Sequence, residues 1–283
     1  MDLASEIARN VNAALAEDVG SGDLTALLTP ADSLATAAVI SRSSVVLCGR
    51  EWFDACYRAL DASVSIRWQV PEAGMAQPGA RLCTVTGPVR ALLTGERTAL
   101  NFLQLLSGVA TITRRYVDAI RGTRALIVDT RKTLPGLRLA EKYAVRTGGG
   151  TNHRLGLYDG ILIKENHIAA AGGVAAALEA ARRIAPPGIW IQIEVENLEQ
   201  LATALAAGAR KVLLDNMGTA MLKAAVELTA GRAELEASGG ITLENVRVVA
   251  ETGVDRISIG GLTKDVAAAD LSMRFNASEV APG

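Results

Sequence analysis

Apolar residues recur at two different spacings in the first third of the chain. In residues 3–17, Leu3, Ile7 and Val11 stand four positions apart, which predicts an amphipathic helix. Between about 34 and 90 the apolar residues form short runs separated by glycine and proline, which predicts strands. The predicted strands cover residues 37–41, 45–49, 64–70 and 81–87, with a short helix at 51–60. Residues 1–110 are therefore expected to form a small α/β domain with an antiparallel sheet.

The longest helical pattern runs from about residue 94 to residue 121. Leu103, Leu106 and Val109 belong to a series of apolar residues that step by three or four. Thr94 is predicted as the N-cap, which puts Arg97 in the first turn, where the helix dipole disfavours a cation. We therefore expect a partner or ligand to hold Arg97, and we expect this helix to bridge two domains.

A repeat begins after Gly122. Short apolar runs that end on polar residues or glycine alternate with alanine-rich helical stretches, which is typical of βα units in a parallel sheet. The predicted strands are 125–129, 161–164, 189–196, 211–216, 235–240 and 257–261, and the predicted helices are 174–184, 198–207, 219–229 and 242–252. Residues 111–283 are therefore expected to form a second domain that ends in a C-terminal tail.

The number of predicted strands bears on the architecture. Six strands instead of eight favour an irregular, open α/β barrel of about six to seven parallel strands. The alternative is a doubly wound open sheet, but no GxGxxG motif follows the first strand of the repeat. In a barrel the reactive groups lie at the carboxyl ends of the strands. Here those ends carry charged residues and glycine pairs.

The composition limits the class of protein. Of 283 residues, 49% are hydrophobic and 21% are charged, with a formal net charge of −1, as in ordinary globular proteins. We find no apolar run of membrane-spanning length and no secretory signal, so no membrane partner is expected. The near-neutral charge and the 4% aromatic content argue against nucleic acid as a partner. The three cysteines are scattered without a CxxC pair, which favours a cytoplasmic protein.

Positive charge is concentrated in residues 129–167. This window holds seven Lys and Arg against four Asp and Glu, together with both histidines of the chain. Guanidinium and ammonium groups, and backbone N–H groups beside glycine, all bind carboxylate or phosphate, so the window suits a polyanionic small molecule. The candidate anion-binding residues are Arg97, Arg131, Lys132, His153, Arg154 and Lys164. A solvated basic surface is the alternative.

Two acids and two glycine pairs complete the candidate site. Glu194 and Asp215 lie on successive strands and can share Mg²⁺ through water or bind sugar hydroxyls, unless Glu194 only pairs with a barrel lysine. Ser238-Gly239-Gly240 and Gly260-Gly261 are candidates for phosphate binding through backbone N–H groups, or else simple tight turns. Lys164 can also be a Schiff-base lysine, although the surrounding cations favour anion binding.

Several longer motifs occur in one order along the chain. They are Glu96–Thr98, Asp129–Gly136, Lys142–Gly156, Leu162–His167, Ile193–Glu196, Leu214–Asn216 and Ser238–Gly240. In these motifs the chain resembles the quinolinate phosphoribosyltransferase family, also called carboxylating nicotinate-nucleotide pyrophosphorylases. The resemblance extends from the Glu17–Thr25 loop to about Leu271. Glu165 stands where many members have aspartate, which is a conservative change.

The resemblance implies a two-domain subunit in a homodimer. The implied reaction transfers phosphoribosyl from phosphoribosyl pyrophosphate to quinolinate with decarboxylation, in the presence of Mg²⁺. Arg131, Arg154 and Lys164 would hold the carboxylates of quinolinate, and Arg97 would come from the partner subunit. Thr130, Lys132 and His153 would lie near the substrates. Lys132, Glu194 and Asp215 would be catalytic, and Glu194 and Asp215 would also hold the metal ion. The 5′-phosphate would be bound by Ser238, Gly239, Gly240, Gly260 and Gly261.

Two other functions are considered. One is a non-catalytic or molybdenum-transport-associated homologue that binds an anionic ligand on the same scaffold. The complete Thr130–Gly136 and Leu162–Lys164 motifs argue against it, as do Glu194 and Asp215, because a site that only binds anions gains nothing from two acids. The other is a Schiff-base aldolase, which borohydride trapping at Lys164 would reveal.

Overall fold

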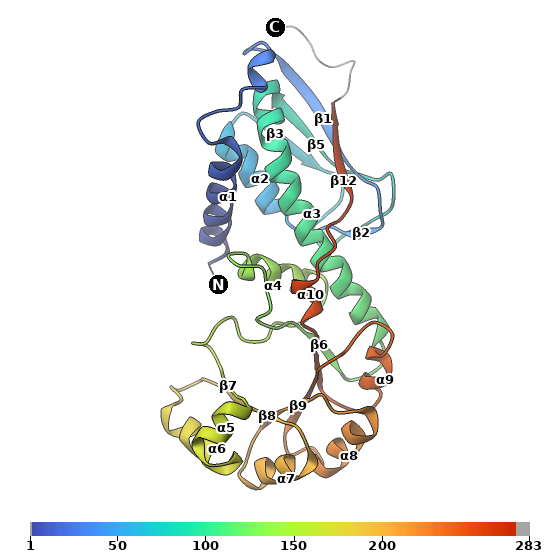
Figure 1. The fold of residues 1–283 in the computed structure, drawn as a ribbon. Helices are drawn as coiled ribbons and strands as arrows, with labels where there is room; N and C mark the ends of the chain where they lie inside the picture. The colour runs from blue at the N-terminus through green and yellow to red at the C-terminus, as the bar shows by residue number, and fades with distance from the viewer. Residues whose placement is uncertain (1, 276–283) are drawn as a thin grey trace. The chain divides into compact units, whose positions relative to one another are not determined.

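The computed structural model describes residues 2–275, which fold into two compact units. Unit 1 comprises the described residues up to Ile112, residues 134–149 and the chain from Asp265 onward. Unit 2 comprises residues 113–133 and 150–264. Helix α3 (Val89–Ala119) begins in unit 1 and ends in unit 2, as the predicted bridging helix does (Figure 1). None of the described helices combines the length and the apolar character needed to cross a bilayer.

Unit 1 is built around an antiparallel sheet with the strand order β12-β1-β5-β3. Its elements are α1 (Leu3–Val19), the short 3-10 helix Ala26–Leu28, β1 (Leu34–Ser41), β2 (Val45–Val46), α2 (Arg50–Leu60), β3 (Ser65–Trp68), β4 (Met75–Ala76), β5 (Arg81–Pro88), α4 (Arg138–Thr147) and β12 (Leu271–Phe275). Strands β2 and β4 form a separate pair. The α/β domain with an antiparallel sheet is thus confirmed.

Aromatic side chains of α2 form part of the core of unit 1. Trp52, Phe53 and Tyr57 are fully buried, because they share one face of the helix with Cys56. The ring of Phe53 lies 5.2 Å from that of Tyr57 and 5.4 Å from that of Trp68, both edge-on. These contacts attach α2 to the sheet.

The C-terminal strand lies in the sheet of unit 1. We expected residues 111–283 to form the barrel domain with a tail, whereas β12 pairs antiparallel with β1 and residues 134–149 also pack in unit 1. Leu271 and Met273 are buried at alternate positions of β12. This period of two gives the strand one apolar face, which it buries on the first sheet that the chain forms.

Helix α3 begins earlier than predicted. It starts at Val89, directly after Pro88 ends β5, so Thr94 and Arg97 lie inside the helix. The Thr94 hydroxyl does not cap the helix but donates a hydrogen bond to Asp23 Oδ2 at 2.9 Å. The helix-dipole argument for a partner at Arg97 is therefore wrong, although Arg97 itself is an exposed residue of α3.

Unit 2 is an open α/β barrel of six parallel strands in the order β6-β11-β10-β9-β8-β7, as the sequence pattern predicts. Its strands and helices are β6 (Leu126–Val128), β7 (Ile161–Ile163), α5 (Glu165–Ala171), α6 (Val174–Ile184), β8 (Ile191–Val195), α7 (Leu198–Ala206), β9 (Lys211–Asp215), α8 (Thr219–Thr229), β10 (Glu234–Ser238), α9 (Val246–Ala250), β11 (Arg256–Ser258) and α10 (Gly261–Lys264). Figure 1 shows α6, α7 and α8 outside the strands.

The strand order excludes the doubly wound alternative. From β7 to β11 each strand lies beside its successor in the chain, and β11 then pairs with β6, the first strand of the unit. A doubly wound sheet instead reverses its direction of growth at an internal strand. Thr151 continues the ladder at the free edge of β6 through a bridge to Val128. All six carboxyl ends face the same side, since the strands are parallel.

Candidate active site

The carboxyl edge of the barrel gathers most of the predicted site residues. Each of them lies in the last two residues of a strand or follows a strand within four residues. Thr130, Arg131 and Lys132 follow β6, Lys164 follows β7, Glu194 and Asp215 belong to β8 and β9, Ser238 ends β10 before Gly239 and Gly240, and Gly260 and Gly261 follow β11. Arg97 lies on α3 within unit 1.

Lys164 and Glu194 form an ion pair at this edge. Lys164 Nζ lies 3.3 Å from Glu194 Oε2, with the lysine side chain 51% exposed and the glutamate side chain 13% exposed. Burial raises the pKa of Glu194, the Lys164 charge opposes that shift, and the charges of Asp215 and Glu165 add to it. The expected alternative, a barrel lysine paired with Glu194, is therefore observed, but Lys164 is itself a candidate site residue and half of its side chain is exposed to solvent.

The acids at β8 and β9 fit a hydrated metal ion. Glu194 lies close enough to Asp215 for the charge of Asp215 to raise its pKa, so the two carboxylates are near neighbours at the edge of the barrel. Within residues 2–275 no group of three or more Asp, Glu, His or Cys side chains is placed to hold a metal alone. Mg²⁺ keeps several waters and takes one or two carboxylates together with substrate phosphates, so two acids suffice for it.

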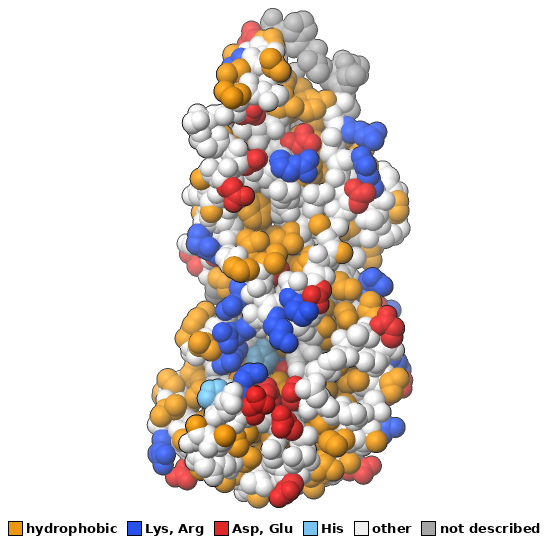
Figure 2. Space-filling view, in the orientation of Figure 1, with side chains coloured by type: hydrophobic (Ala, Val, Ile, Leu, Met, Phe, Trp, Pro, Cys, Tyr) orange, Lys and Arg blue, Asp and Glu red, His pale blue; other side chains and the backbone are white. Residues whose placement is uncertain are grey.

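Two arginines from different segments lie near each other in the site. Burial lowers the pKa of Arg154, and the charge of Arg131 lowers it further, whereas Asp159 opposes the shift. Arg154 Nη1 donates to the carbonyl of Gly160 at 3.0 Å, and Arg131 Nε is buried without a hydrogen-bond partner. Two guanidinium groups close enough for one charge to shift the pKa of the other favour an anion near both. On the face shown in Figure 2, Lys and Arg side chains gather beside a group of Asp and Glu side chains.

Asp129 connects the segments that carry these arginines. Its carboxylate is fully buried at the end of β6 and accepts hydrogen bonds from His153 N at 2.8 Å and Asn152 Nδ2 at 2.7 Å. Asp129 thus stands two residues before Arg131 and holds the backbone one residue before Arg154. The carboxylate fixes both arginine segments relative to the barrel.

A side chain added at two of the candidate glycines would meet a neighbouring side chain. A Cβ on Gly260 would lie 2.9 Å from Lys132 Cδ, and a Cβ on Gly239 would lie 2.1 Å from Asn216 Oδ1. Gly239 and Gly240 have φ values of 99° and 59°, in the region that favours glycine. Gly260 thus lets the Lys132 side chain pass close to the backbone, and phosphate binding by the glycine pairs stays a prediction.

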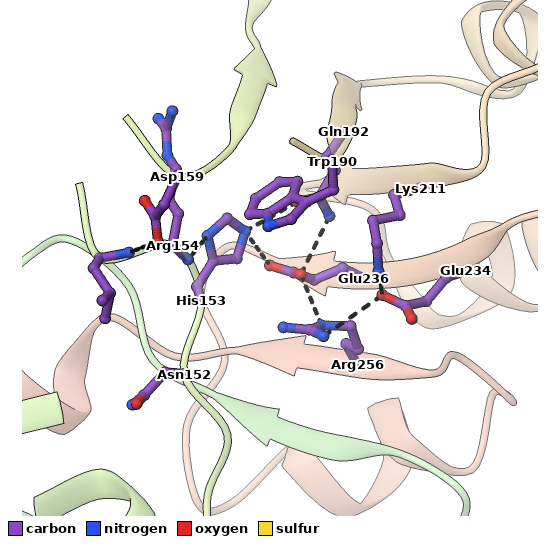
Figure 3. A pocket seen from close by; sticks show the side chains of 11 residues that line it. Asn152, His153, Arg154, Asp159, Trp190, Gln192, Lys211, Glu234, Glu236 and Arg256 are labelled. Carbon is purple, nitrogen blue, oxygen red and sulfur yellow. Dashed lines mark hydrogen bonds and ion pairs between the residues drawn. The ribbon is translucent and has the colours of Figure 1, made fainter. Parts of the chain in front are cut away.

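The sequence analysis missed a group of polar residues inside the barrel. They line a cavity of about 370 Å³ with His153 and Arg154, and the missed members are Trp190, Gln192, Lys211, Glu234, Glu236 and Arg256 (Figure 3). Gln192 and Glu236 interrupt the apolar runs of β8 and β10, and this was the available signal. The ring of His153 points into this group, with Nε2 2.9 Å from Gln192 Oε1. Anion binding by His153 stays a prediction.

The comparison with family models covers nearly the whole chain. The C-terminal domain of quinolinate phosphoribosyl transferase matches residues 109–274, and the N-terminal domain matches residues 23–107. The chain belongs to the quinolinate phosphoribosyltransferase family. The motifs that carry the resemblance thus lie, with the exception of Glu96–Thr98, within the matched C-terminal domain.

Similar proteins and solved structures agree with this family. The nicotinate-nucleotide pyrophosphorylase (carboxylating) of Mycobacterium leprae is 44% identical over 93% of this chain and 95% of its own length. The probable nicotinate-nucleotide pyrophosphorylase of Bacillus subtilis is 43% identical over 91% and 89%. The structure of the Francisella tularensis nicotinate-nucleotide pyrophosphorylase superposes with a TM-score of 0.93 at 43% identity, covering 96% of both chains. Both domains of the quinolinate phosphoribosyltransferase family are therefore present in this chain.

Proposed function

We propose that the protein transfers the phosphoribosyl group of phosphoribosyl pyrophosphate to quinolinate and releases pyrophosphate and carbon dioxide, which leaves nicotinate mononucleotide. The observation that carries this proposal is the arrangement at the barrel edge. Arg131 and Arg154 lie near each other. Lys164 Nζ lies 3.3 Å from Glu194 Oε2, and the charge of Asp215 raises the pKa of Glu194. Cations for a dicarboxylate thus stand next to acids for a sugar and a metal ion.

Arg131, Arg154 and Lys164 are assigned to the two carboxylates of quinolinate. Adjacent carboxylates on one ring repel each other, and three cations offset that repulsion while they orient the ring nitrogen toward the ribose. The unpartnered Nε of Arg131 supports this assignment, because a bound carboxylate would satisfy it. Thr130 and His153 are assigned to the neighbourhood of this subsite. Thr130 Oγ1 accepts a hydrogen bond from the backbone N of Lys132 at 3.1 Å.

Glu194 and Asp215 are assigned to the sugar and to Mg²⁺. As the bond from C1′ to pyrophosphate breaks, positive charge develops on the ribose carbon, and a nearby carboxylate stabilises it. The two acids would hold Mg²⁺ through water, and the ion would supply neutralisation of the pyrophosphate charge. Lys132 adds a second cation from the β6 side, and Ser238, Gly239, Gly240, Gly260 and Gly261 offer backbone donors to the 5′-phosphate.

Decarboxylation follows from the charge of the product ring. Once the ring nitrogen bonds to C1′ it is positive, and it stabilises the electron pair left at the adjacent carbon when carbon dioxide departs. A proton then takes the place of the carboxylate. The protein contributes orientation and charge, and no covalent bond to an enzyme nucleophile forms, so Lys164 acts as a cation and not as a Schiff base.

The quaternary structure and the location of the protein are further parts of this proposal. We assign a homodimer to the protein, in which the exposed Arg97 of one subunit reaches the quinolinate of the other. Apolar side chains support an interface on unit 1, because Leu24 and Leu28 are 81% and 83% exposed. The scattered, buried cysteines support a reducing cytoplasm.

The decisive experiment is incubation of the purified protein with quinolinate, phosphoribosyl pyrophosphate and Mg²⁺. Carbon dioxide and nicotinate mononucleotide are expected in equal amounts. Binding of quinolinate without any product would favour the non-catalytic alternative, and borohydride-trapped keto substrate on Lys164 would favour the aldolase.

A further inference from the structure

The ring of His153 is held at both nitrogens. Nδ1 accepts a hydrogen bond from the backbone N of Arg154 at 2.8 Å, and Nε2 lies 2.9 Å from Gln192 Oε1. The His153 side chain is only 8% exposed, and the ring of Trp190 meets it edge-on at 5.1 Å. Because Nδ1 is an acceptor, the proton of the neutral imidazole lies on Nε2 and is donated to Gln192.

A buried carboxylate orients Gln192 in turn. Gln192 Nε2 donates to Glu236 Oε2 at 3.2 Å, and the Glu236 side chain is 2% exposed. An amide that gives its N–H to a carboxylate must turn its oxygen the other way, which here is toward His153 (Figure 3). Arg256 Nε lies 3.3 Å from Glu236 Oε2 and offsets its charge. Each hydrogen bond between Glu236 and the backbone of Arg154 therefore joins one donor to one acceptor: Gln192 Nε2 donates to Glu236, His153 Nε2 donates to Gln192, and Arg154 N donates to His153.

This chain of contacts is costly for a barrel core. A buried carboxylate loses its hydration, and Glu236 Oε1 has no hydrogen bond in the structure, although it lies 3.8 Å from His153 Nε2. Apolar residues at positions 192 and 236 would fill the interior without that cost. The polar residues are therefore better explained by what they orient than by a gain in stability.

We propose that Gln192 and Glu236 are positioning residues for the substrate site. They fix the Nε2–H tautomer of His153, and the ring then holds the backbone of Arg154, while Asp129 holds the N–H of His153 from the other side. The Arg154 guanidinium is thereby kept beside Arg131. The inference rests on the proposed function, because that function assigns Arg154 to quinolinate.

The first test reads the tautomer and needs no activity. The chain has only two histidines, so protein labelled with ¹⁵N-histidine shows two rings, and a His167→Gln variant assigns them. The wild type is expected to show His153 as the neutral Nε2–H tautomer, and Gln192→Met is expected to lose that single state. A neutral Nδ1–H tautomer or a charged ring in the wild type would overturn the inference, whether or not any variant folds.

The second test measures quinolinate affinity by calorimetry in wild type, Gln192→Met, Arg154→Ala and the double variant. Gln192→Met is expected to weaken binding about tenfold, since a small misplacement of a binding group is sufficient for that. The double variant is expected to bind no worse than Arg154→Ala, because Gln192 acts through Arg154. An unchanged affinity in Gln192→Met, or losses that add up, would contradict the inference.

Glu179→Gln is the control. Glu179 is 70% exposed on α6 and pairs with Arg183 at 3.2 Å, and it does not line the cavity that holds His153 and Gln192. This variant is expected to bind quinolinate within about twofold of wild type. A wild type that binds no quinolinate would refute the proposed function, and the ring tautomer would still decide the present inference.

Discussion

Lys164 Nζ lies 3.3 Å from Glu194 Oε2, and the two residues come from neighbouring parallel strands. In the proposed reaction Lys164 faces a carboxylate of quinolinate, whereas Glu194 faces the developing charge of the ribose. The pair therefore marks the boundary between the two substrates. The charge of Lys164 also lowers the pKa of Glu194 against the effect of burial.

Lys164→Met is expected to move the acid limb of the kcat/KM profile to higher pH. Burial already raises the pKa of Glu194, and the variant removes the nearby cation that opposes this shift. Glu194 then takes up its proton at a higher pH, and the ionised form that the reaction needs is lost earlier as the pH falls. The measurement is the pH profile at saturating Mg²⁺. A shift to lower pH would contradict the assignment, and thermal unfolding checks that the fold is retained.

Arg131→Ala is expected to raise KM for quinolinate about tenfold or more, because a hydrogen bond to a charged group contributes ~1.5–3 kcal/mol. KM for phosphoribosyl pyrophosphate should change much less. Arg183→Ala is the control, since Arg183 is 69% exposed on α6 and pairs only with Glu179 among the described ion pairs. Equal KM values for quinolinate in wild type and Arg131→Ala would remove Arg131 from the site.

Asp215→Asn and Glu194→Gln are expected to lower kcat at least a hundredfold, because each variant removes charge that stabilises the transition state. The Mg²⁺ concentration for half-maximal activity should rise in both variants, while quinolinate affinity in the absence of Mg²⁺ should stay close to wild type. Glu179→Gln, 70% exposed on α6, controls for the change in net charge. Unaltered Mg²⁺ dependence would show that the two acids do not hold the ion.

Gly260→Ala is expected to lower activity about tenfold with little loss of stability. The added Cβ would lie 2.9 Å from Lys132 Cδ, so the flexible lysine moves aside and its ammonium leaves the site. Gly218→Ala is the control, because a Cβ there meets nothing within 4 Å and its φ is −67°. Steady-state kinetics and thermal unfolding test the prediction. Full activity in Gly260→Ala would mean that the position of Lys132 is unimportant.

Arg97→Ala and Glu194→Gln are expected to complement each other when mixed. In a homodimer that shares its sites, exchange of subunits produces hybrids in which one of two sites has both residues intact. Activity should therefore return to about a quarter of wild type after subunit exchange at equal concentrations. Mixtures that stay as inactive as the separate variants would place Arg97 outside the partner's site.

Local patterns were sufficient for the barrel and for most of the candidate site. The strands of βα units are short apolar runs, and parallel pairing brings all their carboxyl ends to one edge, so Lys164, Glu194 and Asp215 were predictable as neighbours. The start of α3 was not, because Thr94 resembles an N-cap although Pro88 already ends the preceding strand. Helix propensity extends on both sides of Thr94, and no local signal separates a cap from an interior threonine there.

The sequence alone specified the hydrophobic period of the helices and strands, the family, and the location of the charged residues at the carboxyl edge of the parallel strands. The tertiary structure decided which distant segments share a sheet and which polar groups meet inside the barrel. Strand β12 joins β1 across more than two hundred residues, and Glu236 reaches His153 through Gln192. Such contacts depend on the register and twist of strands that are far apart in the chain, and the spacing of side chains within one element carries no information about either.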